Sequence, residues 1–145
     1  MEAENRLQGT AVTGVIGEDV HIVGIRIIER ALMDAGIKVT SLGAQVSQEE
    51  FINAALETNA DAILVSSFSG HAEILVRSFR DKCIEAGLDN IILYIGGSLL
   101  LSEENWDQVE KKFKELGFDR VYPPGTSPTR AVEDLKTDIS HRRRK

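Results

Sequence analysis

Ala62-Ile63-Leu64-Val65 is an unbroken apolar run, and it decides the fold class of this chain. A strand this apolar is expected where helices cover both faces of a sheet, as they do in parallel α/β proteins. Other strand-like runs lie on both sides of it along the chain, at residues 11–16, 37–42, 91–95 and 119–122. The pattern therefore predicts five strands.

Helical stretches separate these runs. Residues 23–35 carry apolar side chains at helical spacing and are followed by Gly36, a typical residue at a helix C-terminus. Ser47 and Glu50 have the spacing of a capping box at the start of the next helix. The further helices are expected at about residues 71–86, at 102–117 with Ser102 at its head, and at 128–138.

Strands that alternate with helices in short units form a parallel sheet with helices on both faces. A length of 145 residues and five strands fit the flavodoxin-like, doubly wound α/β fold, with the strand order 2-1-3-4-5. We expect one domain over residues 8–138. A basic tail at residues 139–145 is expected to be frayed and solvated.

The composition excludes several classes of protein. Hydrophobic residues make up 42% of the chain and charged residues 28%, which is ordinary for a globular domain. The single cysteine, Cys83, excludes an internal disulfide framework, and no apolar run has the length of a transmembrane helix. A net charge of −6 argues against a nucleic-acid surface. We therefore expect a cytoplasmic protein with neither nucleic-acid nor membrane partners.

The ligand site of such a fold lies beyond the carboxyl ends of the strands, near the switch point between the first and third strands. The loops expected there are residues 17–21, 66–70, 96–98 and 123–126. Three of them are rich in glycine or hydroxyl side chains, which allow close backbone approach and hydrogen bonding. The first loop, residues 17–21, differs from the others because it contains both a carboxylate and an imidazole.

Common users of this fold do not match these loops. A phosphorylated receiver domain needs an aspartate at the end of the third strand, where Ser66 and Ser67 stand. A flavodoxin needs a hydroxyl-rich phosphate loop after the first strand, and here that loop is acidic. The sequence of residues 14–19 lacks the G-x-G-x-x-G pattern of dinucleotide-binding domains, and the chain has no Walker loop.

Asp19 and His21 in the first loop are candidates for metal ligation. A neutral imidazole can bind a metal through one nitrogen while a carboxylate accepts a hydrogen bond from the other nitrogen and fixes the ring. Asp19 precedes His21 by two residues, and Gly24 leaves room for a bulky ligand. The alternative is a surface histidine that is merely paired with a nearby acid.

The pattern Asp19-x-His21-x-x-Gly24, with Ser66-Ser67 and Gly96-Gly97 downstream, resembles the B12-binding signature of adenosylcobalamin-dependent mutases. The resemblance extends over about residues 10–138 and is greatest to the small subunit of glutamate mutase. It is carried by residues 14–17, 61–67, 82–88, 118–122 and 124–126.

The resemblance implies how the cofactor is held. The dimethylbenzimidazole base leaves the cobalt, and the nucleotide tail enters a slot between the sheet and the first helix. His21 becomes the lower axial ligand of cobalt, and Asp19 is its hydrogen-bond partner. The other contacts implied are Glu18, Val20, Ile22 and Gly24 after the first strand; Ser66, Ser67 and Phe68 along the slot; Gly96, Gly97, Ser98, Leu99, Leu100, Leu101 and Ser102 around the tail; and Pro124, Gly125 and Thr126 at its far end.

The resemblance also implies the activity. The chain would be the cobalamin-binding subunit of an isomerase that converts L-glutamate to 3-methylaspartate by radical chemistry. A separate, barrel-shaped large subunit would hold the substrate, and this chain would add no catalytic residue beyond cofactor ligation.

A stand-alone corrinoid carrier for methyl transfer and a B12-responsive regulator are the alternative functions. Carriers usually have a helical bundle before this domain, whereas the first strand is expected near residue 10. A regulator would normally bring a DNA-binding domain. Both points favour the mutase.

Overall fold

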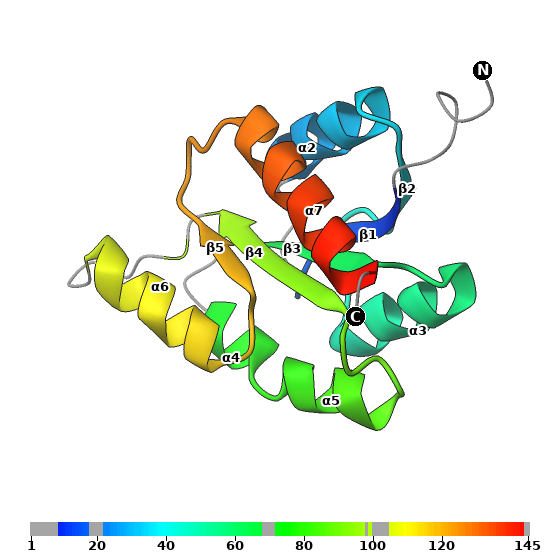
Figure 1. Ribbon diagram of the computed structural model, residues 1–145. Coiled ribbons are helices and arrows are strands. Elements are labelled where there is room, and N and C mark those ends of the chain that lie inside the picture. The colour runs from blue at the N-terminus through cyan, green and yellow to red at the C-terminus, as the bar shows by residue number, and fades with distance from the viewer. Residues whose placement is uncertain (1–8, 18–21, 68–71, 98, 100–104, 144–145) are drawn as a thin grey trace, which may run out of the picture.

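The computed structural model describes residues 9–17, 22–67, 72–97, 99 and 105–143. Its centre is one parallel sheet with the strand order β2-β1-β3-β4-β5 (Figure 1). The strands are β1 (Gly9–Val15), β2 (Ile37–Ser41), β3 (Ala62–Ser67), β4 (Ile92–Gly97) and β5 (Arg120–Tyr122). The doubly wound fold predicted from the sequence is confirmed.

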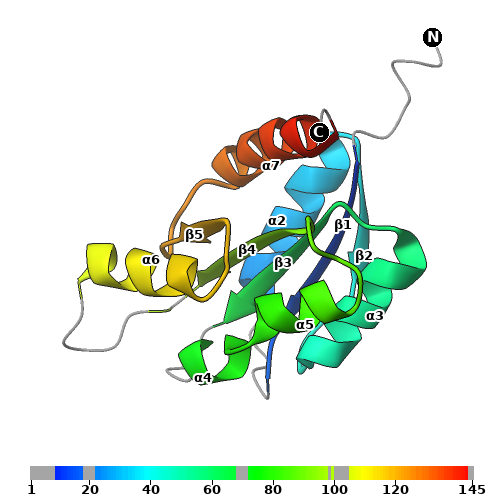
Figure 2. The same cartoon turned by 60° about the horizontal axis from the view of Figure 1, so that its bottom comes forward.

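Helices cover both faces of the sheet (Figures 1 and 2). One face carries α2 (Val23–Asp34) and α7 (Pro128–Arg143). The other face carries α3 (Gln48–Thr58), α4 (Ala72–Val76), α5 (Phe79–Glu85) and α6 (Trp106–Glu115). Each face has its own buried core, and alternate residues of β3 point into each of them, with Ile63 in one core and Leu64 in the other. None of the described helices is long and apolar enough to cross a bilayer.

Hydrogen bonds between residues close in sequence stabilise the first turns of α3 and α6. Ser47 and Glu50 form the predicted capping box at the start of α3. The start of α6 differs from the prediction that Ser102 heads this helix, because Asn105 is the N-cap and forms a capping box with Gln108. Asn is as good an N-cap as Ser, and the reciprocal bond from Gln108 stabilises this start.

The helix predicted at residues 71–86 is two helices. Ser78 adopts a left-handed backbone conformation, with φ of 67°, between α4 and α5. The side-chain amide of Gln48 donates hydrogen bonds to the carbonyl oxygens of Leu75 and Arg77, at 2.6 and 3.1 Å. Helical periodicity does not reveal this break, because it depends on a partner from α3 that satisfies the carbonyl groups released there.

The C-terminal residues also differ from the prediction of a frayed tail after Asp138, because α7 continues to Arg143. Ile139 is 3% exposed and belongs to the core between α7 and the sheet. Arg142 donates hydrogen bonds to the carboxylate of Asp61, at 2.9 Å, and to the carbonyl oxygen of Asn90. These long-range contacts hold the last turns of the helix in place.

Candidate functional site

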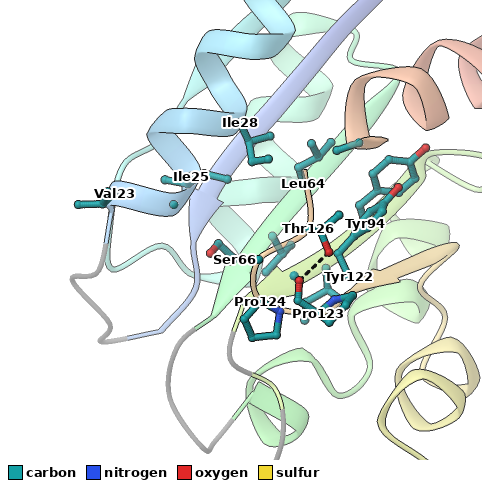
Figure 3. A pocket seen from close by; sticks show the side chains of 17 residues that line it. Val23, Ile25, Ile28, Leu64, Ser66, Tyr94, Tyr122, Pro123, Pro124 and Thr126 are labelled. Atoms are coloured by element: carbon teal, nitrogen blue, oxygen red, sulfur yellow. Dashed lines mark hydrogen bonds between the residues drawn. The ribbon is translucent and has the colours of Figure 1, made fainter. Parts of the chain in front are cut away.

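A cavity of about 450 Å³ opens between α2 and α7, at the carboxyl ends of β3, β4 and β5 (Figure 3). This is where the switch-point rule places ligands, and the volume is typical of small-molecule sites. The wall is largely apolar. It is formed by Val23, Gly24, Ile25, Ile28, Leu64, Val65, Ser66, Tyr94, Ile95, Gly96, Gly97, Tyr122, Pro123, Pro124, Gly125, Thr126 and Ala131.

Part of the site predicted from the sequence comes together at this cavity. The predicted residues that line it are Gly24, Ser66, Gly96, Gly97, Pro124, Gly125 and Thr126. The Thr126 hydroxyl donates a 2.7 Å hydrogen bond to the carbonyl oxygen of Pro123, which closes the turn after β5. At Gly96, a Cβ would lie 3.4 Å from the Cβ of Tyr122, which is an ordinary van der Waals contact.

Three predicted residues lie elsewhere. Leu99 is 4% exposed and packs into the core on the α3–α6 face, away from the cavity. Ser67 is fully buried beside Ser66, and its hydroxyl has no hydrogen-bond partner among the described residues. Because successive residues of a strand face opposite sides, Ser66 and not Ser67 presents its side chain to the cavity. Ile22 is the N-cap residue of α2 and does not line the cavity.

The remaining predicted residues lie outside the described part of the chain. They are Glu18, Asp19, Val20, His21, Phe68, Ser98, Leu100, Leu101 and Ser102. The described residues on either side of 18–21 are Gly17, whose amide donates to Val46, and Ile22, at the start of α2. Gly24, in the first turn of α2, lines the cavity. Within the described residues, no group of three or more His, Cys, Asp or Glu side chains could hold a metal ion.

Sequence reasoning missed several residues of the cavity wall, among them Ile28, Leu64, Tyr94, Tyr122 and Ala131. For two of these residues, Leu64 and Tyr94, the periodicity of a strand could have predicted the position. Leu64 precedes Ser66 by two residues and Tyr94 precedes Gly96 by two, so the period of a strand puts each pair on one face. Tyr122 and Ala131 reach the cavity only through the packing of β5 and α7.

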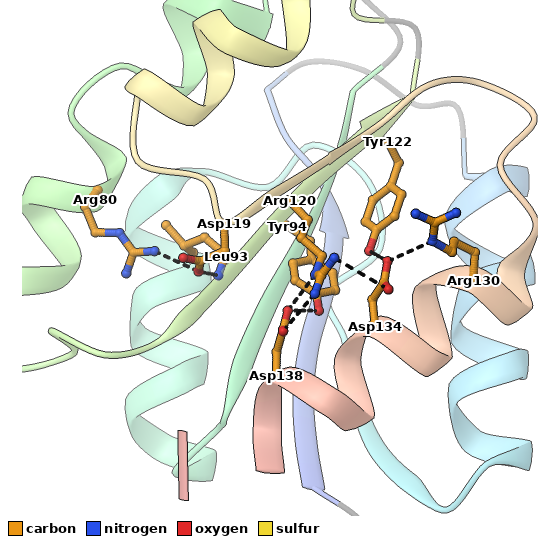
Figure 4. A network of polar contacts seen from close by, with 9 residues as sticks. All are labelled: Arg80, Leu93, Tyr94, Asp119, Arg120, Tyr122, Arg130, Asp134 and Asp138. Carbon is orange, nitrogen blue, oxygen red and sulfur yellow. Dashed lines mark hydrogen bonds and ion pairs between the residues drawn. The ribbon is translucent and has the colours of Figure 1, made fainter. Parts of the chain in front are cut away.

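Tyr94 and Tyr122 form the aromatic end of the cavity. Their ring centroids are 5.5 Å apart at an interplanar angle of 67°, an edge-to-face arrangement. The Tyr94 hydroxyl donates to Asp138 at 2.5 Å, and the Tyr122 hydroxyl donates to Asp134 at 2.6 Å (Figure 4). Both hydroxyl groups are therefore bound by α7, and the rings present their apolar surfaces to the cavity.

Arg120 joins the two tyrosine–aspartate pairs. Its guanidinium makes a bidentate contact with Asp138, at 2.8 and 3.0 Å, and lies 3.5 Å from Asp134. Burial opposes ionisation of Asp138, but hydrogen bonds from Arg120 and Tyr94 outweigh it and hold the pKa of Asp138 below its ordinary value. Burial, together with hydrogen bonding to an aspartate, raises the pKa of Tyr94 and that of Tyr122 well above the usual range.

Comparison with known proteins identifies the family of this chain. The family model described as "B12 binding domain" matches residues 9–133. The glutamate mutase sigma subunit of Carboxydothermus hydrogenoformans is 56% identical over 128 residues, which cover 88% of this chain and 93% of that relative. The sigma subunit of Clostridium tetani is 50% identical over 131 residues, covering 90% of this chain and 96% of the relative.

A solved structure supports the fold. The monomethylamine corrinoid protein of Methanosarcina barkeri aligns with a TM-score of 0.74 at 20% identity, over 94% of this chain and 60% of that protein. At this identity the likeness concerns the fold alone. The family model and the sequence relatives cover nearly the whole domain, and they show that this chain belongs to the B12-binding domain family and, within it, to the glutamate mutase sigma subunits.

Proposed function

We propose that this chain binds adenosylcobalamin and serves as the small subunit of a carbon-skeleton mutase that converts L-glutamate to 3-methylaspartate. One observation carries the proposal: an apolar cavity lies at the switch-point edge of the sheet in a chain that is about half identical to glutamate mutase sigma subunits. We expect the chain to act in the cytoplasm, since its single cysteine is buried and unpaired.

The cavity fits the nucleotide tail of cobalamin by its chemistry. Ile28 and Leu64 provide apolar walls for an aromatic base. Ser66 and Thr126 add hydroxyl groups, and the backbone at Gly96 and Gly97 is open to a sugar or phosphate. We assign the tail to this cavity, with Gly24 leaving room beside α2.

We further propose that His21 is the lower axial ligand of cobalt and that Asp19 accepts a hydrogen bond from its other ring nitrogen. The support is the D-x-H-x-x-G pattern and the position of its glycine, Gly24, on the cavity wall. Adenosylcobalamin supplies radical chemistry when bound, through homolysis of its cobalt–carbon bond. The contribution of this chain is to bind the cofactor and orient it.

The substrate site is assigned to a barrel-shaped large subunit, with cobalamin between the two chains. Large apolar side chains are exposed on the helices that follow β1 and β3 in the chain: Val23 and Ile27 on α2 are 74% and 52% exposed, and Ile74 on α4 is 64% exposed. Val23 also lines the cavity. Exposed apolar side chains beside a ligand cavity are typical of a surface that a partner covers.

Reconstitution tests this function. The full chain is combined with adenosylcobalamin and the large subunit of a glutamate mutase, and glutamate is compared with other substrates of skeletal rearrangement. We expect turnover of glutamate only when both subunits and the cofactor are present. Methyl transfer to cobalamin bound by this chain, without mutase turnover, would instead identify a corrinoid carrier.

A further inference from the structure

Four charged side chains recur at every fourth position of α7: Arg130, Asp134, Asp138 and Arg142. Residues at this spacing lie on one face of a helix. We call these four residues the charged stripe. All of its members have partners. Arg130 pairs with Asp134, and the two aspartates bind the tyrosines and Arg120 (Figure 4). Arg142 binds Asp61.

The charged stripe differs from the apolar face of the same helix. Val132, Leu135 and Ile139 pack into the core that also contains Leu32 of α2. Apolar contacts of this kind have no fixed geometry and favour the closest possible packing. Along the cavity, however, α7 contributes only Ala131 to the wall. The two helices therefore share a core at one end and stand apart at the other.

Apolar packing does not account for the space between them. A cavity with apolar walls costs free energy in proportion to its volume, so movable walls would close over it. Tyr94 and Tyr122 stand between the sheet and α7 at the end of the cavity, with their hydroxyl groups on Asp138 and Asp134. The side chains of these aspartates are only 21% and 16% exposed. Loss of either bond would therefore leave polar groups poorly solvated.

We propose that the pairs Tyr94–Asp138 and Tyr122–Asp134 are positioning pairs that hold the cavity open for the cofactor's nucleotide tail before it binds. The tyrosine rings act as spacers of fixed length. The aspartates prevent the rings from turning into the cavity and prevent α7 from moving toward the sheet. Arg120 fixes the carboxylates from the side of β5. A preformed cavity avoids the cost of opening it on binding, so these pairs contribute to affinity without a direct polar contact.

The inference rests on the proposed function. Two ligands, cobalamin and cobinamide, distinguish a failure of the inference from a failure of the proposed function. Cobinamide has the corrin ring and cobalt of cobalamin but lacks the nucleotide tail. The full chain and its variants Tyr122→Phe and Asp134→Asn are titrated with cobalamin and with cobinamide, and binding is followed by visible absorbance. Glu133→Gln is the matched control, since it makes the same change in charge at the adjacent, exposed position of α7.

We expect the affinity for cobalamin to fall roughly tenfold in Tyr122→Phe and Asp134→Asn, as for the loss of one hydrogen bond that fixes a binding wall, while cobinamide binding stays unchanged. Glu133→Gln should bind both ligands like the original chain. Far-ultraviolet circular dichroism checks the fold, and if Asp134→Asn does not fold, Tyr122→Phe keeps the ring and decides the question alone.

Two results would overturn the inference: unchanged affinity for cobalamin in a folded Tyr122→Phe variant, or an equal loss of affinity for both ligands. If the original chain binds neither ligand, the proposed function itself fails. Titration of the original chain alone reveals this failure, so no variant is needed to detect it.

Discussion

Gly97 passes so close to Ser67 that a Cβ atom on Gly97 would lie 2.1 Å from the Ser67 carbonyl oxygen. The two residues are paired in register at the ends of β3 and β4. The φ angle of Gly97 is also positive, at 112°, a conformation that side chains disfavour. This contact therefore requires glycine for two reasons at the edge where the cavity opens.

Gly97→Ala should destabilise the protein by at least about 2 kcal/mol, because backbone strain and a clash with a carbonyl group add together. Gly43→Ala is the control, since Gly43 also has a positive φ, of 78°, but nothing within 4 Å of its Cβ position. Urea denaturation followed by the fluorescence of Trp106, the single tryptophan, measures both variants. Equal losses of stability would show that the contact with Ser67 contributes nothing.

Arg142→Gln should lower the free energy of unfolding by about 1–3 kcal/mol. The variant loses the charged contact with Asp61, whose side chain is 8% exposed, and the bond to the Asn90 carbonyl group. Lys136→Gln removes the same charge from an exposed position of α7 and should change stability little. If both variants unfold alike, the contacts of Arg142 with Asp61 and Asn90 do not stabilise the fold.

Both tyrosines of the chain belong to the network at the end of the cavity, so their ionisation can be observed without interference from other tyrosines. Their pKa values are raised by burial and by hydrogen bonds to aspartates. A raised pKa in the folded state stabilises the protein below the unfolded value of about 10, and this stability is lost as the pH rises above it. We expect tyrosinate absorbance to appear together with alkaline unfolding. Titration of either tyrosine near pH 10 in the folded protein would contradict this.

Asp138→Asn should make stability less dependent on acidic pH. The pKa of Asp138 is lowered in the folded state, because hydrogen bonds from Arg120 and Tyr94 outweigh the effect of burial. Its ionised form therefore stabilises the fold above the unfolded pKa of about 3.9, and this contribution is lost as the pH falls through the folded value. Chemical denaturation between about pH 6 and pH 3 should show a smaller fall in stability for the variant. A parallel fall in both proteins would exclude Asp138 as a source of acid sensitivity.

His21→Ala should abolish the proposed axial bond to cobalt while the chain still folds, because the variant removes the imidazole assigned to that bond. Electron paramagnetic resonance of the cob(II)alamin complex reports this through nitrogen superhyperfine coupling. His141→Ala is the control, since His141 lies on α7 and is exposed. Coupling to a histidine nitrogen that survives in His21→Ala would refute the assignment.

Much of this molecule was predictable from its sequence by itself. The apolar run at Ala62–Val65 predicted a strand covered on both faces, and its alternation with helices predicted the parallel sheet and strand order that the structure has. The loops at the carboxyl ends of the strands then predicted where a ligand would bind, and Ser66, Gly96 and Thr126 do line the cavity there. The predictions of the fold succeeded because strand periodicity and sheet topology are local or general rules, whereas the ligand site stays a prediction.

Tertiary packing decided the rest. Gln48 donates to the carbonyl group of Arg77 where the expected helix breaks, and Asp61 binds Arg142 in a helix that was expected to end at Asp138 but continues to Arg143. Tyr122 lines the cavity, and its hydroxyl group donates to Asp134 of α7. In each case the deciding partner is distant in the sequence or lies on another element. Periodicity describes which face a residue occupies, but only the folded chain determines which polar group from another element meets it there.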